Sequence, residues 1–178
     1  IEVADSAPDL FYYCTNHSNM GGSAKTPDSG TITFATTVVG GNPSDHPYHN
    51  VGSANKFGID GSTATADVTL LLTEGTTFRF DQSDSTNSGH PLRLSTTPNG
   101  THASGSQYTT GVTTNGVPGT AGAYTEITVA DSAPTLYYYC TNHSNMGWTA
   151  KTPDVTIIAG TGNLIAVSYT HLTLPTIE

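Results

Sequence analysis

The stretch TLYYYCTNHSNMG (135–147) combines a strand-like segment with three potential metal ligands. Its first half is aromatic and rich in residues that favour β-structure. Its second half places a thiol, an imidazole and a thioether at Cys140, His143 and Met146, with the spacing C-x2-H-x2-M. A loop of this length can wrap three ligands around one ion. The stretch therefore predicts a β-strand that ends in a metal-binding loop.

The donor types in this loop indicate copper. A trigonal set of one Cys and two His with a distant axial Met is the coordination that selects copper and tunes its redox potential. The loop supplies only one His, so a second must come from a neighbouring strand. The candidate is His90 in NSGHPLRL (87–94). We expect one copper ion per complete module, held by His90, Cys140, His143 and Met146.

A near-copy of the same stretch begins the chain. Residues 1–28 return at 127–154 with five differences, an offset of 126 residues. The first copy carries Cys14, His17 and Met20, which we interpret as the partial metal site of a truncated repeat. A repeat at this distance predicts that the parent protein is a tandem array of such modules.

The remaining sequence predicts an all-β fold. No segment has a convincing helical period, and glycine-rich turns separate short alternating segments, as in a β-sandwich. In the tyrosine run, alternation places Tyr138 in the core and Tyr137 and Tyr139 nearer the surface. The segment 97–123 is expected to be a long surface excursion. The strand candidates are 31–39, 56–60, 68–74, 76–82, 91–96, 125–130, 135–140 and 154–160.

We divide the chain into four segments. Residues 1–39 are assigned to the truncated repeat, 40–55 to a Gly/Pro-rich linker, and 56–160 to the complete module. Residues 161–178 form a tail that, from about Val167, resembles the translated read-through of a sequencing adapter. We therefore exclude His171 from the candidate ligands.

The motifs and their order resemble the cupredoxins. TTFRFDQSD (76–84), GHPLRL (89–94) and YYYCTNHSNMG (137–147) follow the order of that family over about 56–160, and the short ligand loop is similar to that of amicyanin. The GHP and YYYC segments are also similar in sequence to cupredoxin-like repeats of phage virion and bacterial surface proteins. The resemblance implies a Greek-key sandwich, a mononuclear type 1 copper and one-electron transfer.

Two residues depart from the family pattern. Many cupredoxins have Asn after the first His, bonding across to the Cys loop, and Pro91 stands there in this chain. We expect this substitution to loosen the site. Amicyanin-like loops carry Pro where Asn142 stands, so an extra backbone N–H can reach the thiolate sulfur and shift the reduction potential.

Composition excludes several function classes. The formal charge is -9, with 5 Lys and Arg against 14 Asp and Glu, which disfavours nucleic acid and anionic membranes as partners. No apolar run approaches the roughly 18 to 20 residues of a membrane-spanning helix. Without a His-x-His pair or a nucleophile elbow, the sequence favours a non-enzymatic role. Few charges and many Thr, Ser and Gly favour an extracellular, periplasmic or virion-surface location.

Other interpretations stay open. Zinc accepts Cys and His, although structural zinc sites usually take four Cys or His ligands rather than Met. A sandwich can also keep Cys and Met purely for packing, and the module could then be structural or adhesive, with neighbouring repeats rather than a redox partner as its contacts. The other histidines, His46, His49 and His102, are expected to be exposed and without a role.

Overall fold

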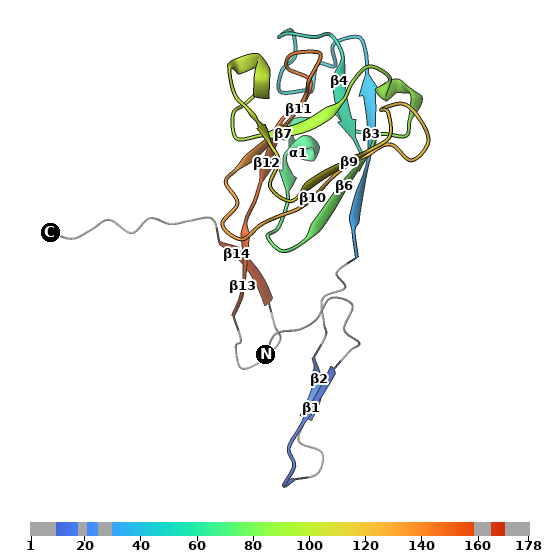
Figure 1. Cartoon of the computed structure of the whole chain (residues 1–178). Coiled ribbons are helices and arrows are strands. Elements are labelled where there is room, and N and C mark those ends of the chain that lie inside the picture. Colours follow the sequence, from blue (N-terminus) through green and yellow to red (C-terminus); the bar gives the residue numbers. More distant parts are fainter. Residues whose placement is uncertain (1–9, 18–20, 25–29, 159–164, 170–178) are drawn as a thin grey trace, which may run out of the picture. The chain divides into compact units, whose positions relative to one another are not determined.

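We analysed a computed structural model, which describes residues 10–17, 21–24, 30–158 and 165–169. The chain divides into two compact units, residues Ile1–Thr31 and Ile32–Glu178. The described part of the first unit is a hairpin in which β1 (Leu10–Tyr13) pairs antiparallel with β2 (Gly21–Ala24). The second unit contains the candidate site (Figure 1).

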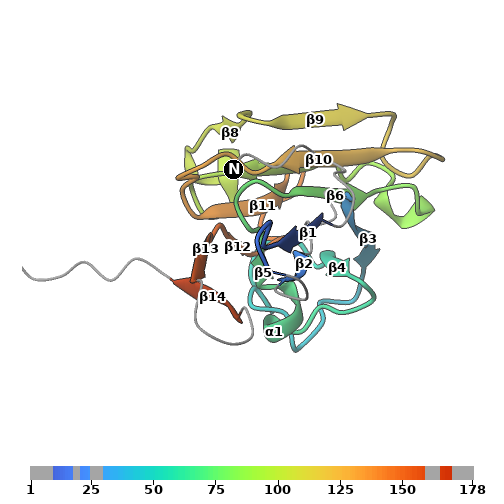
Figure 2. The same ribbon diagram turned by 90° about the horizontal axis from the view of Figure 1, so that it is seen from below.

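The second unit is a β-sandwich of two five-stranded sheets, whose strands appear side by side in Figure 2. Each sheet is antiparallel except for one parallel pair, β3 with β6 in the first and β12 with β5 in the second. The first sheet has the order β4 (Lys56–Ile59), β3 (Ile32–Val39), β6 (Thr77–Asp81), β10 (Tyr124–Thr128), β9 (Val112–Asn115). The second has the order β5 (Leu70–Leu71), β12 (Thr149–Lys151), β11 (Leu136–Cys140), β7 (Leu92–Ser95), β8 (Gln107–Tyr108).

Short helices and a terminal hairpin complete the described elements. The hairpin pairs β13 (Asp154–Ile158) with β14 (Ile165–Tyr169). The helical turns are α1 (Thr65–Val68), η1 (Ser85–Asn87) and η2 (Gly100–Ala103). All of them lie in connections between strands, so the predicted all-β class is confirmed.

The core lies between the two sheets and follows the period-two alternation of the strands. On β6 the exposure pattern alternates, with Phe78 and Phe80 buried. On β11, Leu136, Tyr138 and Cys140 are buried together, as predicted. The buried cluster that joins the sheets consists of Phe57, Ile59, Val68, Leu70, Leu72, Phe78, Phe80, Leu92, Leu94, Ile127, Val129, Leu136, Tyr138, Cys140, Met146 and Ala150.

The expected exposure of Tyr139 is wrong, because the side chain is 1% exposed. The turn η2 covers it. A Cβ atom added to Gly100 would lie 2.5 Å from the Tyr139 ring, so only glycine allows this close approach. The segment 97–123 is likewise more ordered than predicted, since it forms η2 and also the strands β8 and β9 at the edges of both sheets.

Residues 32–55 belong to the same compact unit as the sandwich. The strand β3, which the sequence assigned to the preceding repeat, lies between β4 and β6. Phe34 on β3 stacks on Phe78 with ring centroids 5.9 Å apart. The segment 40–55 folds back on itself through a hydrogen bond of 2.8 Å from the Asn42 N–H to the Ala54 carbonyl.

Candidate metal site

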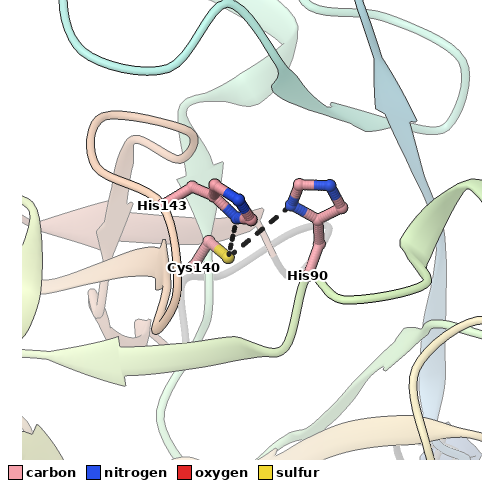
Figure 3. Close-up of side chains that lie close together, drawn as sticks. All are labelled: His90, Cys140 and His143. Atoms are coloured by element: carbon pink, nitrogen blue, oxygen red, sulfur yellow. Dashed lines mark hydrogen bonds between the residues drawn. The ribbon is translucent and has the colours of Figure 1, made fainter.

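The candidate site lies where β7 begins and β11 ends in the second sheet. These strands are antiparallel neighbours, with Cys140 opposite Leu92. His90 lies two residues before Leu92 and His143 three residues after Cys140, so the strand pairing brings both imidazoles to the thiol. Figure 3 shows the three side chains pointing toward one another. The sequence could name these residues, and the register of two strands brings them together.

The three side chains form a cluster that could hold a metal ion. The Cys140 Sγ lies 3.8 Å from the Nδ1 atoms of both His90 and His143, and the two rings are 4.5 Å apart between centroids. Typical metal bonds are about 2.3 Å to thiolate sulfur and about 2.0 to 2.1 Å to imidazole nitrogen. With those lengths, a separation of 3.8 Å corresponds to an angle of about 120° at the metal. Both sulfur–nitrogen separations are therefore compatible with one metal ion bound by the thiol and the two imidazoles.

The cluster is buried on one side and open on the other. Cys140 and His90 are 0% and 8% exposed, whereas His143 is exposed. Burial lowers the pKa of His90, and the neighbouring His143 lowers it further, which favours the neutral imidazole. Burial raises the pKa of the Cys140 thiol, and the backbone N–H groups of Asn142 and His143 partly offset that rise. A neutral imidazole is the form that ligates metals.

A buried glutamine fixes the backbone on both sides of His90. Gln82 is 1% exposed; its Nε2 donates to the His90 carbonyl at 2.9 Å, and its Oε1 accepts from the Leu92 N–H at 3.1 Å. Its neighbour Asn87, which is fully buried, donates to the Thr36 carbonyl on β3 at 2.7 Å. The amide pair thus ties the backbone of His90 to the first sheet.

Pro91 has no N–H to donate, but other groups connect the segment around it to the Cys140 loop. The Asn142 side chain, in the loop, donates to the Gly89 carbonyl at 2.9 Å. The Thr141 N–H donates to the Pro91 carbonyl at 3.1 Å. Two hydrogen bonds therefore join the Cys140 loop to the segment that carries His90.

Met146 is fully buried and belongs to the same core cluster as Cys140. The turn before it is held by Asn145, which has a left-handed φ of 58°. The Asn145 N–H donates to the Asn99 Oδ1 at 2.6 Å, and the Met146 carbonyl accepts from the Phe57 N–H at 2.8 Å. These contacts hold the backbone around Met146 in one conformation. The role of Met146 as an axial ligand remains a prediction.

In the first unit, the structure brings together the first two residues of the partial set. The Cys14 Sγ lies 3.4 Å from the His17 Nδ1, and neither Cys14 nor Cys140 is in a disulfide. Met20, the third residue of this set, lies outside the described residues, as does His171. The C-x2-H spacing alone therefore suffices to place the thiol beside the imidazole in both copies.

Two of the remaining histidines differ from expectation. His46 is buried, with 2% exposure, and its Nδ1 accepts from the Tyr48 N–H at 3.0 Å. His102 is exposed, but its Nε2 is 2.9 Å from the Cys140 carbonyl. Only His49 is exposed with no contact to the ligand loop among the described residues. Sequence reasoning missed His46 because it lies in a Gly/Pro-rich segment without a hydrophobic period.

Sequence reasoning also missed the supporting residues Gln82, Asn99 and Lys56. Amides and lysines of this kind are common on surfaces, and no local pattern distinguishes those that are buried. The one available signal was the position of Gln82 in FDQSD, as the last residue of the predicted strand 76–82.

In the part of the chain that the structure describes, no helix has the length and apolar character needed to cross a membrane. A scan against protein-family models, a search of curated proteins and a search of solved structures each return no match for this chain.

Proposed function

We propose that residues 32–158 are a copper-binding module of cupredoxin type, with one mononuclear copper of type 1 held by His90, Cys140, His143 and, axially, Met146. The observation that carries the proposal is the pair of 3.8 Å separations between one thiol sulfur and two imidazole nitrogens. A Greek-key sandwich with the family's connectivity belongs to the same proposal.

The donor set favours copper over zinc. Structural zinc sites take four Cys or His ligands in a tetrahedron. Among the described His, Cys, Asp and Glu side chains, only three converge here. A buried thioether at Met146 is the soft, weak fourth ligand that copper accepts in trigonal sites.

Bound copper would supply reversible one-electron exchange. The protein's own residues orient and protect the donors. Gln82 and Asn142 fix the two backbone segments that carry His90 and His143. The core around Cys140 excludes water, whereas His143 is exposed and offers the shortest route to a redox partner.

The repeat places this module in a larger assembly. Near-identical copies 126 residues apart are typical of extended proteins built from tandem modules. We propose that the parent is an extracellular, periplasmic or virion-surface protein whose modules contact neighbouring repeats. Each copper site could then exchange one electron, although the parent protein is not a dedicated electron carrier.

The test is to add Cu(II) to the full chain carrying Cys14→Ser, a substitution that removes the thiol ligand of the partial site. We expect one copper per chain and the intense visible absorption of a copper–thiolate bond. Adding Cys140→Ser should abolish the band. Zn(II) offered in equal amount should not displace the copper. A colourless complex, or a band that survives Cys140→Ser, would contradict a blue-copper site at these residues.

A second candidate function is structural, with no redox role, and the hydrogen bonds around the ligand loop favour it. Asn99, Phe57 and Asn142 hold the loop through hydrogen bonds between protein groups. A structural module should exchange electrons slowly even if copper binding raises its melting temperature. Fast electron self-exchange would favour the redox function.

A further inference from the structure

A lysine is completely buried beside the turn that carries Met146. Lys56, the first residue of β4, is 0% exposed in a chain that has only five Lys and Arg. Lysine is rarely buried, because removing an ammonium group from water is costly unless the group is well paired. Burial lowers the pKa of Lys56. Hydrogen bonds to the ammonium group must therefore offset the cost of its burial.

Among the described residues, both hydrogen-bond partners of the ammonium group are backbone carbonyls. The Lys56 Nζ donates to the Val51 carbonyl and to the Asn145 carbonyl, each at 2.8 Å. Val51 lies in the segment 40–55, and Asn145 immediately precedes Met146. The ammonium group therefore joins that segment to the ligand loop.

The hydrogen bond from Lys56 to Asn145 is one of three that bind consecutive carbonyls of the ligand loop. The Ser53 N–H donates to the Ser144 carbonyl at 3.0 Å, and the Phe57 N–H donates to the Met146 carbonyl at 2.8 Å. Between them, Lys56 Nζ bonds the carbonyl of Asn145. Three consecutive carbonyls of the ligand loop are thus held by one short segment, 53–57.

The left-handed conformation explains why a side chain is needed at the middle position. Asn145 has a left-handed φ of 58° and lies in the turn that precedes Met146. The backbone donors of Ser53 and Phe57 serve the flanking carbonyls. The carbonyl of Asn145, between them, accepts a hydrogen bond from the terminal ammonium group of a long side chain, that of Lys56. Lysine has the reach and the donors for this contact.

We propose that Lys56 is a positioning residue of the copper site: its buried ammonium group fixes the 144–146 turn that carries Met146, and its charge favours the reduced ion. This inference rests on the proposed copper function. The charge effect is Coulombic, since a fixed positive charge in a region of low dielectric disfavours the form of the metal with the higher charge. The positioning effect acts through the backbone of Asn145.

The experiment compares Lys56→Met, Lys56→Gln and the control Lys151→Met in the full chain carrying Cys14→Ser. Lys151 is an exposed lysine on β12, so its replacement removes the same charge from the surface. Lys56→Met removes the charge and both hydrogen bonds. Lys56→Gln removes the charge and keeps a donor, and it serves as the test if Lys56→Met does not fold.

The measurements are the midpoint potential of the copper form and amide hydrogen exchange of the metal-free form. We expect both Lys56 variants to shift the Cu(II)/Cu(I) equilibrium toward Cu(II) by tenfold or more, which is about 59 mV for one electron. Lys151→Met should shift it far less. In the metal-free protein, exchange of the Phe57 amide should become faster in Lys56→Met than in the control.

The outcomes separate this inference from the proposed function. If the Cys14→Ser chain shows the copper–thiolate band but folded Lys56 variants keep its potential, the charge effect of Lys56 is overturned and the copper function stands. If that chain shows no band, the proposed function and the charge effect fail. Hydrogen exchange then decides the positioning role alone: unchanged Phe57 exchange in Lys56→Met overturns it, and faster exchange supports it.

Discussion

The side-chain amide of Asn142 donates a hydrogen bond of 2.9 Å to the carbonyl of Gly89, the residue before His90. This bond connects the loop that carries His143 to the segment that carries the other imidazole. The proline after His90 cannot provide an N–H, so the loop supplies the donor instead. Both imidazoles are thereby held relative to one thiol.

Replacing Asn142 with Ala should loosen this connection. We expect a loss of about 0.5 to 1.5 kcal/mol in the free energy of unfolding of the metal-free protein. Copper should also be lost to a chelator several-fold faster. Urea unfolding and chelator competition measure the two effects.

Asn115→Ala provides the matched control. The Asn115 side chain is also exposed and donates to a glycine carbonyl, that of Gly122, at 2.8 Å. This variant should lose similar stability without changing the rate of copper release. Equal release rates in the two variants would count against a role of Asn142 in the site.

The buried His46 should make the stability of the protein depend on pH. Its pKa is lowered from 6.5 to about 4, chiefly by burial and then by the charge of Lys56, while Asp45 opposes the shift. The unfolded chain therefore binds a proton at His46 at a higher pH than the folded chain does. The free energy of unfolding should fall as the pH drops from 6.5 to about 4, by about 2 to 3 kcal/mol from this group.

His46→Asn isolates this contribution. Asn keeps an acceptor for the Tyr48 N–H and does not titrate in this range. His90 also has a lowered pKa, so part of the pH dependence should remain in the variant. Urea unfolding at several pH values, with both proteins metal-free, measures the difference. Parallel curves for the two proteins would refute the assignment to His46.

The adjacent tyrosines Tyr138 and Tyr139 should respond in opposite ways to loss of the hydroxyl group. Tyr138 donates from its hydroxyl to the Val68 carbonyl at 2.9 Å, so Tyr138→Phe leaves a buried carbonyl unpaired and should cost about 1 to 2 kcal/mol. The buried hydroxyl of Tyr139 has no partner among the described residues. Tyr139→Phe removes an unpaired polar atom and should be neutral or stabilise by up to about 1 kcal/mol. Thermal unfolding of both variants checks the signs, and a large loss in Tyr139→Phe would reveal an unseen partner.

Residues 32–55 should be required for folding of the module. The strand β3 pairs with β4 on one side and β6 on the other, and Phe34 packs on both Phe78 and Phe80. A fragment 56–160 would expose both strand edges and the rings of β6. We expect the fragment 30–158 to unfold cooperatively and 56–160 to show no cooperative transition by circular dichroism. Cooperative folding of the shorter fragment would instead support the boundary predicted from the sequence.

The sequence alone identified the strands whose side chains alternate and the residues of the metal cluster. The alternation on β6 and the spacing of Cys140 and His143 are local, because a strand period and a short loop each extend over only a few residues. The same locality explains why Cys14 and His17 also meet within the first copy.

The tertiary structure decided which residues support the site. His90 meets Cys140 only because β7 and β11 pair in one register, and Tyr139 is buried only because η2 covers it. Lys56 bonds Asn145 across a separation of 89 residues. Contacts of this kind depend on how strands and loops from distant parts of the chain pack together, and no period or spacing in the sequence encodes them. The sequence thus determined the donors, and the packing of the two sheets determined how they are held.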